Sequence, residues 1–67
     1  MAELALAPFE RIMRDNGARR VSQEAVEELR NIIEELAVDI ASRAVQLANH
    51  SGRKTVTAAD VKLAIRE

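Results

Sequence analysis

The 67-residue sequence contains no cysteine, tryptophan or tyrosine, and only one phenylalanine, one histidine, one proline and two glycines. Without cysteine, the chain has no disulfide bonds, no cysteine-ligated zinc and no thiol nucleophile. With a single aromatic side chain, it has no platform on which nucleic-acid bases could stack. One histidine leaves little for metal binding or acid–base catalysis. We therefore expect no cofactor, no metal and no enzymatic activity.

The sequence also lacks a long apolar run. No stretch approaches the roughly 18 apolar residues that a membrane span needs. The first eight residues have no basic region, and their apolar stretch is too short for a signal peptide. We therefore expect a cytoplasmic protein without a membrane partner.

Apolar and charged residues are both abundant, at 48% and 31% of the chain, which is typical of a globular protein. We expect a single domain over residues 1–67. Domains shorter than about 70–80 residues rarely gain more than about 3–5 kcal/mol from one apolar core. Because neither a disulfide nor a metal adds to that stability, the chain is expected to be an oligomer.

The apolar periodicity predicts an all-α fold of three helices. The predicted helices cover residues 5–15, 23–50 and 58–66. Gly17 and Gly52 follow the first two helices, where a left-handed residue commonly ends a helix. Ser22 and Thr57 precede the second and third helices as N-caps, and Pro8 lies in the first turn of the first helix.

The middle helix determines the expected architecture. Its 28 residues give a length of about 42 Å, whereas a compact chain of this size has a diameter of roughly 28 Å. The two short helices cannot cover its wide apolar stripe, but a second copy of the long helix crossing it could. The sequence therefore predicts an interlocked homodimer. Small residues that would allow a close crossing stand at Ala37, Ala41, Ala44 and Ala48.

The net charge of −1 hides a segregation along the chain. Residues 1–21 carry four basic and three acidic residues, for a charge of +1. Residues 22–50 carry two basic and six acidic residues, for −4, and residues 51–67 carry four basic and two acidic residues, for +2. Because a partner responds to the local field, the acidic total does not exclude an anionic partner.

Two basic loops flank the long helix. If two long helices cross antiparallel, Arg19 and Arg20 of one chain approach Arg53 and Lys54 of the other, with Thr55 as a hydroxyl donor. Each end of the dimer would then form a phosphate-binding surface. Charge alone leaves open the alternative that these side chains are simply solvated.

Three blocks of sequence carry a resemblance to a known family. They are LAPFERIMR at residues 6–14, GARRVS at residues 17–22, and HSGRKTV at residues 50–56 with Asp60-Val61. Together, and over essentially the whole chain, they resemble the archaeal histones. The resemblance implies a handshake homodimer of histone folds that bends and wraps double-stranded DNA on the chromosome. It also implies that dimers associate into larger nucleosome-like stacks, with paralogous histones as further partners.

The resemblance also implies roles for individual residues. Arg20 resembles the arginine that enters the DNA minor groove, steadied by Thr55 of the partner chain. Arg11 and Arg14 resemble phosphate contacts from the first helix. Lys54 and Thr55 resemble phosphate contacts from the second loop. Such contacts read the backbone and the deformability of DNA more than its bases.

A second set of residues has structural roles in the resemblance. Arg53 and Asp60 resemble an ion pair between the second loop and the third helix. The patch where two dimers meet resembles Leu47, His50, Asp60 and Leu63. His50 and Asp60 could pair across a two-fold axis there. The other interpretation of His50 is that it complements the helix dipole.

Two other functions compete with DNA packaging. Gly52 to Thr55 is similar to the end of a phosphate-binding loop, but Leu47 stands where that motif requires its first glycine, so the match fails. The second alternative is a histone-fold module that joins proteins in a transcription or regulatory complex. Such a module would not need Arg20, Lys54 and Thr55 together.

Overall fold

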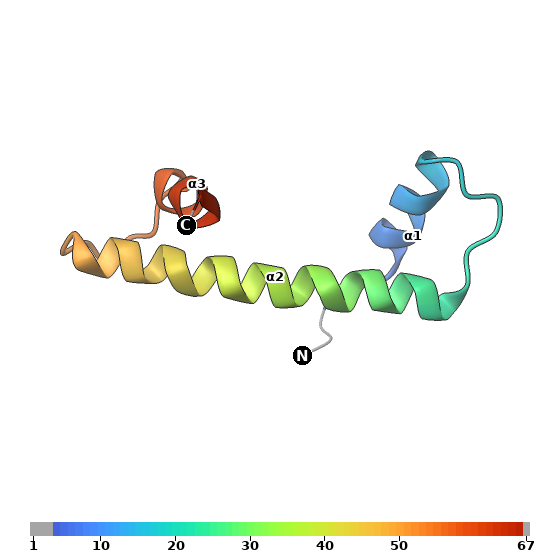
Figure 1. The fold of residues 1–67 in the computed structure, drawn as a ribbon, viewed down its shortest axis with the longest axis horizontal. Helices are drawn as coiled ribbons and strands as arrows, with labels where there is room; N and C mark the ends of the chain where they lie inside the picture. The colour runs from blue at the N-terminus through green and yellow to red at the C-terminus, as the bar shows by residue number, and fades with distance from the viewer. Residues whose placement is uncertain (1–3, 67) are drawn as a thin grey trace. The chain divides into compact units, whose positions relative to one another are not determined.

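A computed structural model describes residues 4–66 and contains three α-helices in that part of the chain (Figure 1). They are α1 (Ala7–Asp15), α2 (Gln23–His50) and α3 (Ala58–Arg66). The predicted all-α fold with a short, a long and a short helix is confirmed. The bounds of α2 and α3 are those predicted, whereas α1 begins two residues later.

The late start of α1 follows from Pro8. The first N–H groups of a helix have no intrahelical acceptor, so a proline costs least there. A helix beginning at Ala5 would place Pro8 fourth, where its N–H is needed. With Ala7 first, Pro8 is second, and Phe9 and Glu10 donate their N–H groups to the carbonyl of Leu6 at 3.0 and 3.1 Å.

Side-chain caps start the other two helices as predicted. The Ser22 hydroxyl accepts the N–H of Ala25 at 3.1 Å. The Thr57 hydroxyl accepts the N–H of Asp60 at 3.4 Å, and the Asp60 carboxylate accepts the N–H of Thr57 at 2.9 Å. This reciprocal pair is a capping box with aspartate in place of glutamate.

The two glycines end α1 and α2. Gly17 and Gly52 have φ of +107° and +70°, a region that residues with a Cβ rarely adopt. The N–H of Gly52 reaches the carbonyl of Asn49, and the N–H of Arg53 reaches that of Ala48, both at 3.0 Å. This pattern is a Schellman motif, and Gly17 ends α1 with the same one.

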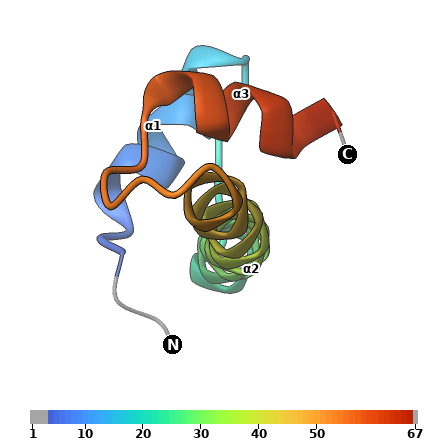
Figure 2. The same ribbon diagram turned by 90° about the vertical axis from the view of Figure 1, so that its left-hand side faces the viewer.

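The chain divides into two units, residues 1–35 and residues 36–67. In the first, α1 lies beside the N-terminal part of α2, and the buried apolar residue is Val26. In the second, α3 crosses the C-terminal part of α2 without running alongside it (Figures 1 and 2). Its buried apolar residues are Ala44, Ala48 and Ala64.

Most large apolar side chains stay exposed in the described chain. Those more than a third exposed are Leu4, Ile12, Ile32, Ile33, Leu36, Val38, Val45, Val56, Val61, Leu63 and Ile65. One valine and three alanines bury too little apolar area to stabilise a domain of this size. These exposed faces favour association with another chain.

Two side chains of α2 tie the flanking segments to it. Arg43 donates to the carbonyl of Ala64 at 3.3 Å and to Asp39 at 2.6 Å, which satisfies a carbonyl in the last turn of α3. Glu34 accepts the N–H of Leu4 at 2.8 Å. In residues 4–66, no helix combines the length and the hydropathy required to cross a membrane.

Candidate functional site

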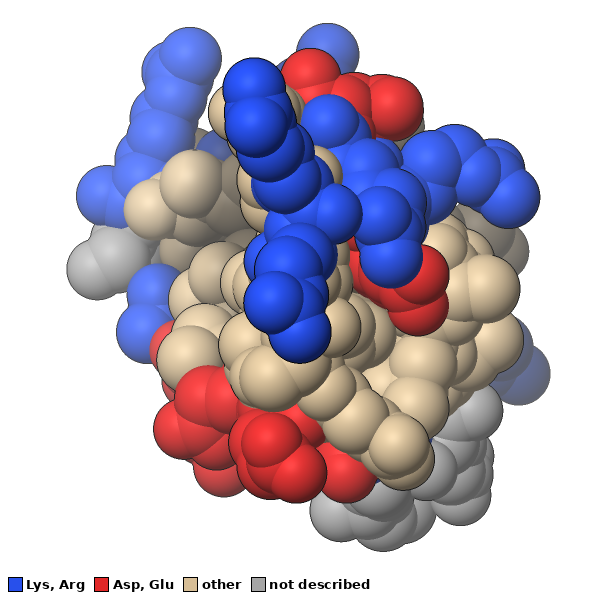
Figure 3. Space-filling view, turned by 90° about the vertical axis from the view of Figure 1, so that its right-hand side faces the viewer, with Lys and Arg blue, Asp and Glu red and all other residues tan. Residues whose placement is uncertain are grey.

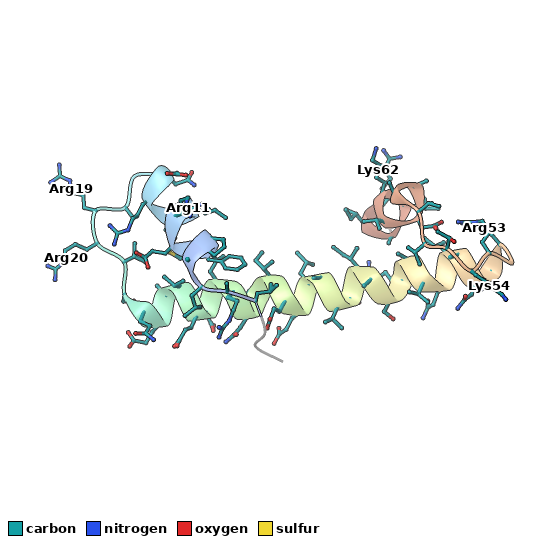
Figure 4. All side chains as sticks on the ribbon, turned by 180° about the vertical axis from the view of Figure 1, so that it is seen from behind. Arg11, Arg19, Arg20, Arg53, Lys54 and Lys62 are labelled. Carbon is teal, nitrogen blue, oxygen red and sulfur yellow. The ribbon has the colours of Figure 1, made fainter. Side chains whose placement is uncertain are left out.

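The first candidate surface comprises α1 and the loop at residues 16–22. Arg11, Arg19 and Arg20 are exposed, and Figure 4 shows Arg19 and Arg20 pointing outward from the loop. Arg14 is also half exposed, but its guanidinium is engaged within the chain. Its Nε lies 3.1 Å from a carboxylate oxygen of Glu10, and its Nη1 donates to the carbonyl of Arg19 at 3.4 Å.

The space-filling view shows how charge is distributed on this side of the molecule. Figure 3 faces the loop at residues 16–22, and Lys and Arg side chains crowd its upper half. The largest group of Asp and Glu side chains lies at the lower edge. Glu10 is an exception on the basic side, since it shares an open hollow of about 270 Å³ with Ala7, Arg11 and Arg14. Cations gathered on one face can contact several phosphates at once.

The second candidate surface is the loop at residues 51–57. Here Arg53 binds Asp60 with two nearly parallel hydrogen bonds, from Nη2 to Oδ1 at 2.6 Å and from Nη1 to Oδ2 at 3.0 Å. The same Nη1 donates to the carbonyl of Thr55 at 3.2 Å. Such forked pairs fix both partners in orientation as well as in distance. The loop is therefore held between α2 and α3 by one arginine.

Asp60 is the most highly connected side chain of this unit. Only 5% of the residue is exposed, and Thr57 adds its backbone N–H and its hydroxyl to the donors from Arg53. The hydrogen bonds from Arg53 and from the Thr57 backbone hold the pKa of Asp60 far below its ordinary value. Asp60 is therefore ionised at any pH near neutrality.

Lys54 and Thr55 lie on the outer side of that loop. Both residues are exposed, and Figure 4 labels Lys54 beside Arg53 at the turn. Within residues 4–66, neither side chain takes part in a hydrogen bond or an ion pair. The ammonium of Lys54 and the hydroxyl of Thr55 are thus available to a ligand such as a phosphate.

The four residues expected to form a contact between dimers all belong to the second unit. His50 and Leu63 are exposed, and Leu47 is half-buried. His50 also lines an open hollow of about 350 Å³ with Gln46 and Asn49. Asp60 differs from the rest, because both of its carboxylate oxygens already accept hydrogen bonds within the chain.

The structure adds side chains that sequence patterns did not single out. Glu10 and Arg43 each organise a tie, and the spacing of Glu10 and Arg14 by four residues on one helix was the available signal for the first. Lys62 and Arg66 on α3 are exposed bases outside the predicted surface. Among residues 4–66, no three His, Asp or Glu side chains come together as a metal site would require.

Comparison with known proteins identifies the family. Residues 2–65 match the family described as "Histone-like transcription factor (CBF/NF-Y) and archaeal histone". The chain is 47% identical over 66 residues to the archaeal histone HAN1 of Thermococcus zilligii, which covers 98% of both chains. It is 48% identical over 66 residues to probable archaeal histone 3 of Methanocaldococcus jannaschii, again covering 98% of both. It is also 36% identical over 56 residues to histone H4 of Dictyostelium discoideum, which covers 84% of this chain and 52% of that protein. The chain therefore belongs to the histone-fold family that comprises the archaeal histones and the CBF/NF-Y histone-like transcription factors.

Proposed function

We propose that this chain binds double-stranded DNA with little sequence preference and compacts it as a homodimer. Archaeal histones are DNA-binding and DNA-packaging proteins, and the relatives nearly identical in length bear that name. One observation carries the proposal. The loops before and after α2 both expose basic side chains, Arg19 and Arg20 in one and Lys54 in the other.

The dimer joins these loops into one surface. Histone-fold proteins form dimers, and the exposed apolar side chains of α2 and α3 supply the area that a second chain would cover. We place two copies of α2 antiparallel, so that Arg19 and Arg20 of one chain lie near Lys54 and Thr55 of the other. All of residues 1–67 then form one histone-fold domain, in keeping with a family match over residues 2–65.

Each basic residue is assigned a contact. Arg20 enters the minor groove, and Thr55 of the second copy steadies it. Lys54, Thr55 and Arg11 contact phosphates, and Arg53 keeps its loop in shape through Asp60. These are backbone contacts, and the single aromatic side chain leaves no stacking platform for bases. Binding should therefore tolerate many sequences and follow DNA deformability.

Larger assemblies form through the end of α2 and through α3. Leu63 and His50 are exposed, and Leu47 lies one turn before His50 on α2. A second dimer would bury the two leucines and bring His50 to the carboxylate of Asp60, which is held in place by Arg53. We propose that dimers line up on DNA in this way, in association with the chromosome.

Gel-shift measurements on random-sequence duplex DNA test the proposal. Because each phosphate contact releases counterions, affinity should fall steeply as salt rises. Tight binding that ignores salt would contradict contacts through phosphates. The absence of binding at low salt would contradict DNA packaging altogether.

A second function remains open because the family description also covers histone-like transcription factors. In that case the same dimer would serve to join proteins in a regulatory complex. Arg20, Lys54 and Thr55 discriminate the two, since joining proteins does not require an exposed phosphate-binding set. If triple substitution of these residues leaves DNA binding unchanged, the protein-joining function is favoured.

A further inference from the structure

The segment that carries the outward-pointing arginines of the first loop is held by few hydrogen bonds. The Schellman motif of α1 accounts for the N–H groups as far as Ala18, and Ser22 begins the cap of α2. Between them, over residues 4–66, one hydrogen bond reaches residues 19–21. It runs from Nη1 of Arg14 to the carbonyl of Arg19 at 3.4 Å.

Arg14 is itself held by Glu10. The two residues are four apart on α1, and Nε of Arg14 lies 3.1 Å from the Glu10 carboxylate. Acid followed by base at this spacing is the favourable order on a helix. With Nε on Glu10 and Nη1 on the Arg19 carbonyl, the planar guanidinium has its orientation set on two sides.

The second loop has the same arrangement with other residues. There Asp60 holds the guanidinium of Arg53, which donates to the carbonyl of Thr55 at 3.2 Å. In both loops, a carboxylate on a neighbouring helix orients an arginine, and that arginine binds a carbonyl beside exposed DNA-facing candidates. The chain therefore ties its two loops by one chemical device.

We infer that Glu10 is a positioning residue for DNA binding, which acts through Arg14 on the backbone that presents Arg19 and Arg20. The inference rests on the proposed function. A carboxylate on a phosphate-binding surface repels DNA, so Glu10 by itself should weaken binding. Its presence among the arginines is explained by the order that it gives to the loop.

The sign of a charge-removing substitution tests this inference. Glu10→Gln and Asp15→Asn each remove one negative charge from α1 with little change of shape. Asp15 is exposed and joins none of the ion pairs within residues 4–66, so it is the matched control. We expect Asp15→Asn to maintain or raise the affinity for duplex DNA. We expect Glu10→Gln to lower it about twofold, the size of an exposed ion pair of this spacing.

Limited trypsin digestion provides a readout without DNA. Cleavage after Arg19 and Arg20, quantified by mass spectrometry, should be about twofold faster in Glu10→Gln and unchanged in Asp15→Asn, because the loop opens more often. Circular dichroism verifies that both variants keep their helices. If cleavage is unchanged in Glu10→Gln, the tie does not order the loop and the inference is wrong.

A double substitution tests whether Glu10 acts through Arg14. In an Arg14→Gln background, Glu10→Gln should no longer lower the affinity and should raise it instead, because only repulsion remains. A loss of affinity that persists in that background would overturn the inference, as would a gain in the single variant. If the unsubstituted protein fails to bind DNA while Glu10→Gln still speeds cleavage, the proposed function is wrong and the ordering of the loop by Glu10 is supported.

Discussion

The strongest prediction concerns Arg20 and the salt dependence of DNA binding. Four bases of the proposed surface are exposed and join none of the ion pairs within residues 4–66: Arg11, Arg19, Arg20 and Lys54. A homodimer therefore presents eight. If each neutralises one phosphate, log K should fall with log salt at a slope of about −7, or about 10⁴-fold between 50 and 200 mM.

Arg20→Ala removes two of these contacts per dimer. The slope should become shallower by about 2, and affinity at low salt should fall for all sequences. Lys62→Ala is the matched control, because it removes the same charge from an exposed residue of α3 outside the proposed surface. Its slope should stay close to that of the unsubstituted protein.

Fluorescence anisotropy with a labelled random duplex, repeated at five or six salt concentrations, gives both slopes. Size-exclusion chromatography verifies that Arg20→Ala remains a dimer. Equal slopes for Arg20→Ala and Lys62→Ala would refute the assignment of Arg20 to the DNA surface. Dissociation of the Arg20→Ala dimer would show that Arg20 has a structural role instead.

Three further predictions follow from the fold and the second unit. Gly52→Ala should lower the free energy of unfolding by about 1–2 kcal/mol, because a residue with a Cβ must adopt a left-handed conformation there; no atom crowds the added Cβ, and an unchanged thermal midpoint would contradict this. Asp60→Asn should be less stable than the unsubstituted protein at neutral pH. Since the folded state lowers the pKa of Asp60, the stability that its carboxylate contributes is present above the ordinary value of 3.8 and is lost as the pH falls below it. The difference in thermal midpoint should therefore shrink below about pH 4, and a constant difference from pH 7 to pH 2 would contradict the role of the ionised carboxylate. His50→Ala should leave binding of the first dimer intact and shorten the longest nuclease-protected fragments, whereas unchanged fragment lengths would remove His50 from the contact between dimers.

Local signals accounted for most of the helix boundaries. Ser22 and Thr57 begin helices because their hydroxyls accept N–H groups only three residues away, and this depends on the sequence itself. Gly17 and Gly52 end helices for a similarly local reason. The predicted start of α1 is wrong by two residues because it does not take account of the position of Pro8 within the first turn.

The ties between elements could not be read from spacing alone. Arg14 reaches the carbonyl of Arg19, and Arg43 reaches that of Ala64, across backbone paths that the sequence does not specify. Long side chains have many rotamers, and one is selected only when the loop or helix beside it is in place. The pairing of Arg53 with Asp60 was expected from the family resemblance, and the structure adds that Thr57 shares the Asp60 carboxylate.

The most direct test of DNA packaging is the length of duplex DNA protected from nuclease as the protein is titrated. If homodimers bind through both loops and then associate, protected fragments should appear and lengthen in equal steps as protein is added. Protection of random lengths, or none at concentrations that shift the duplex in a gel, would contradict packaging by stacked dimers.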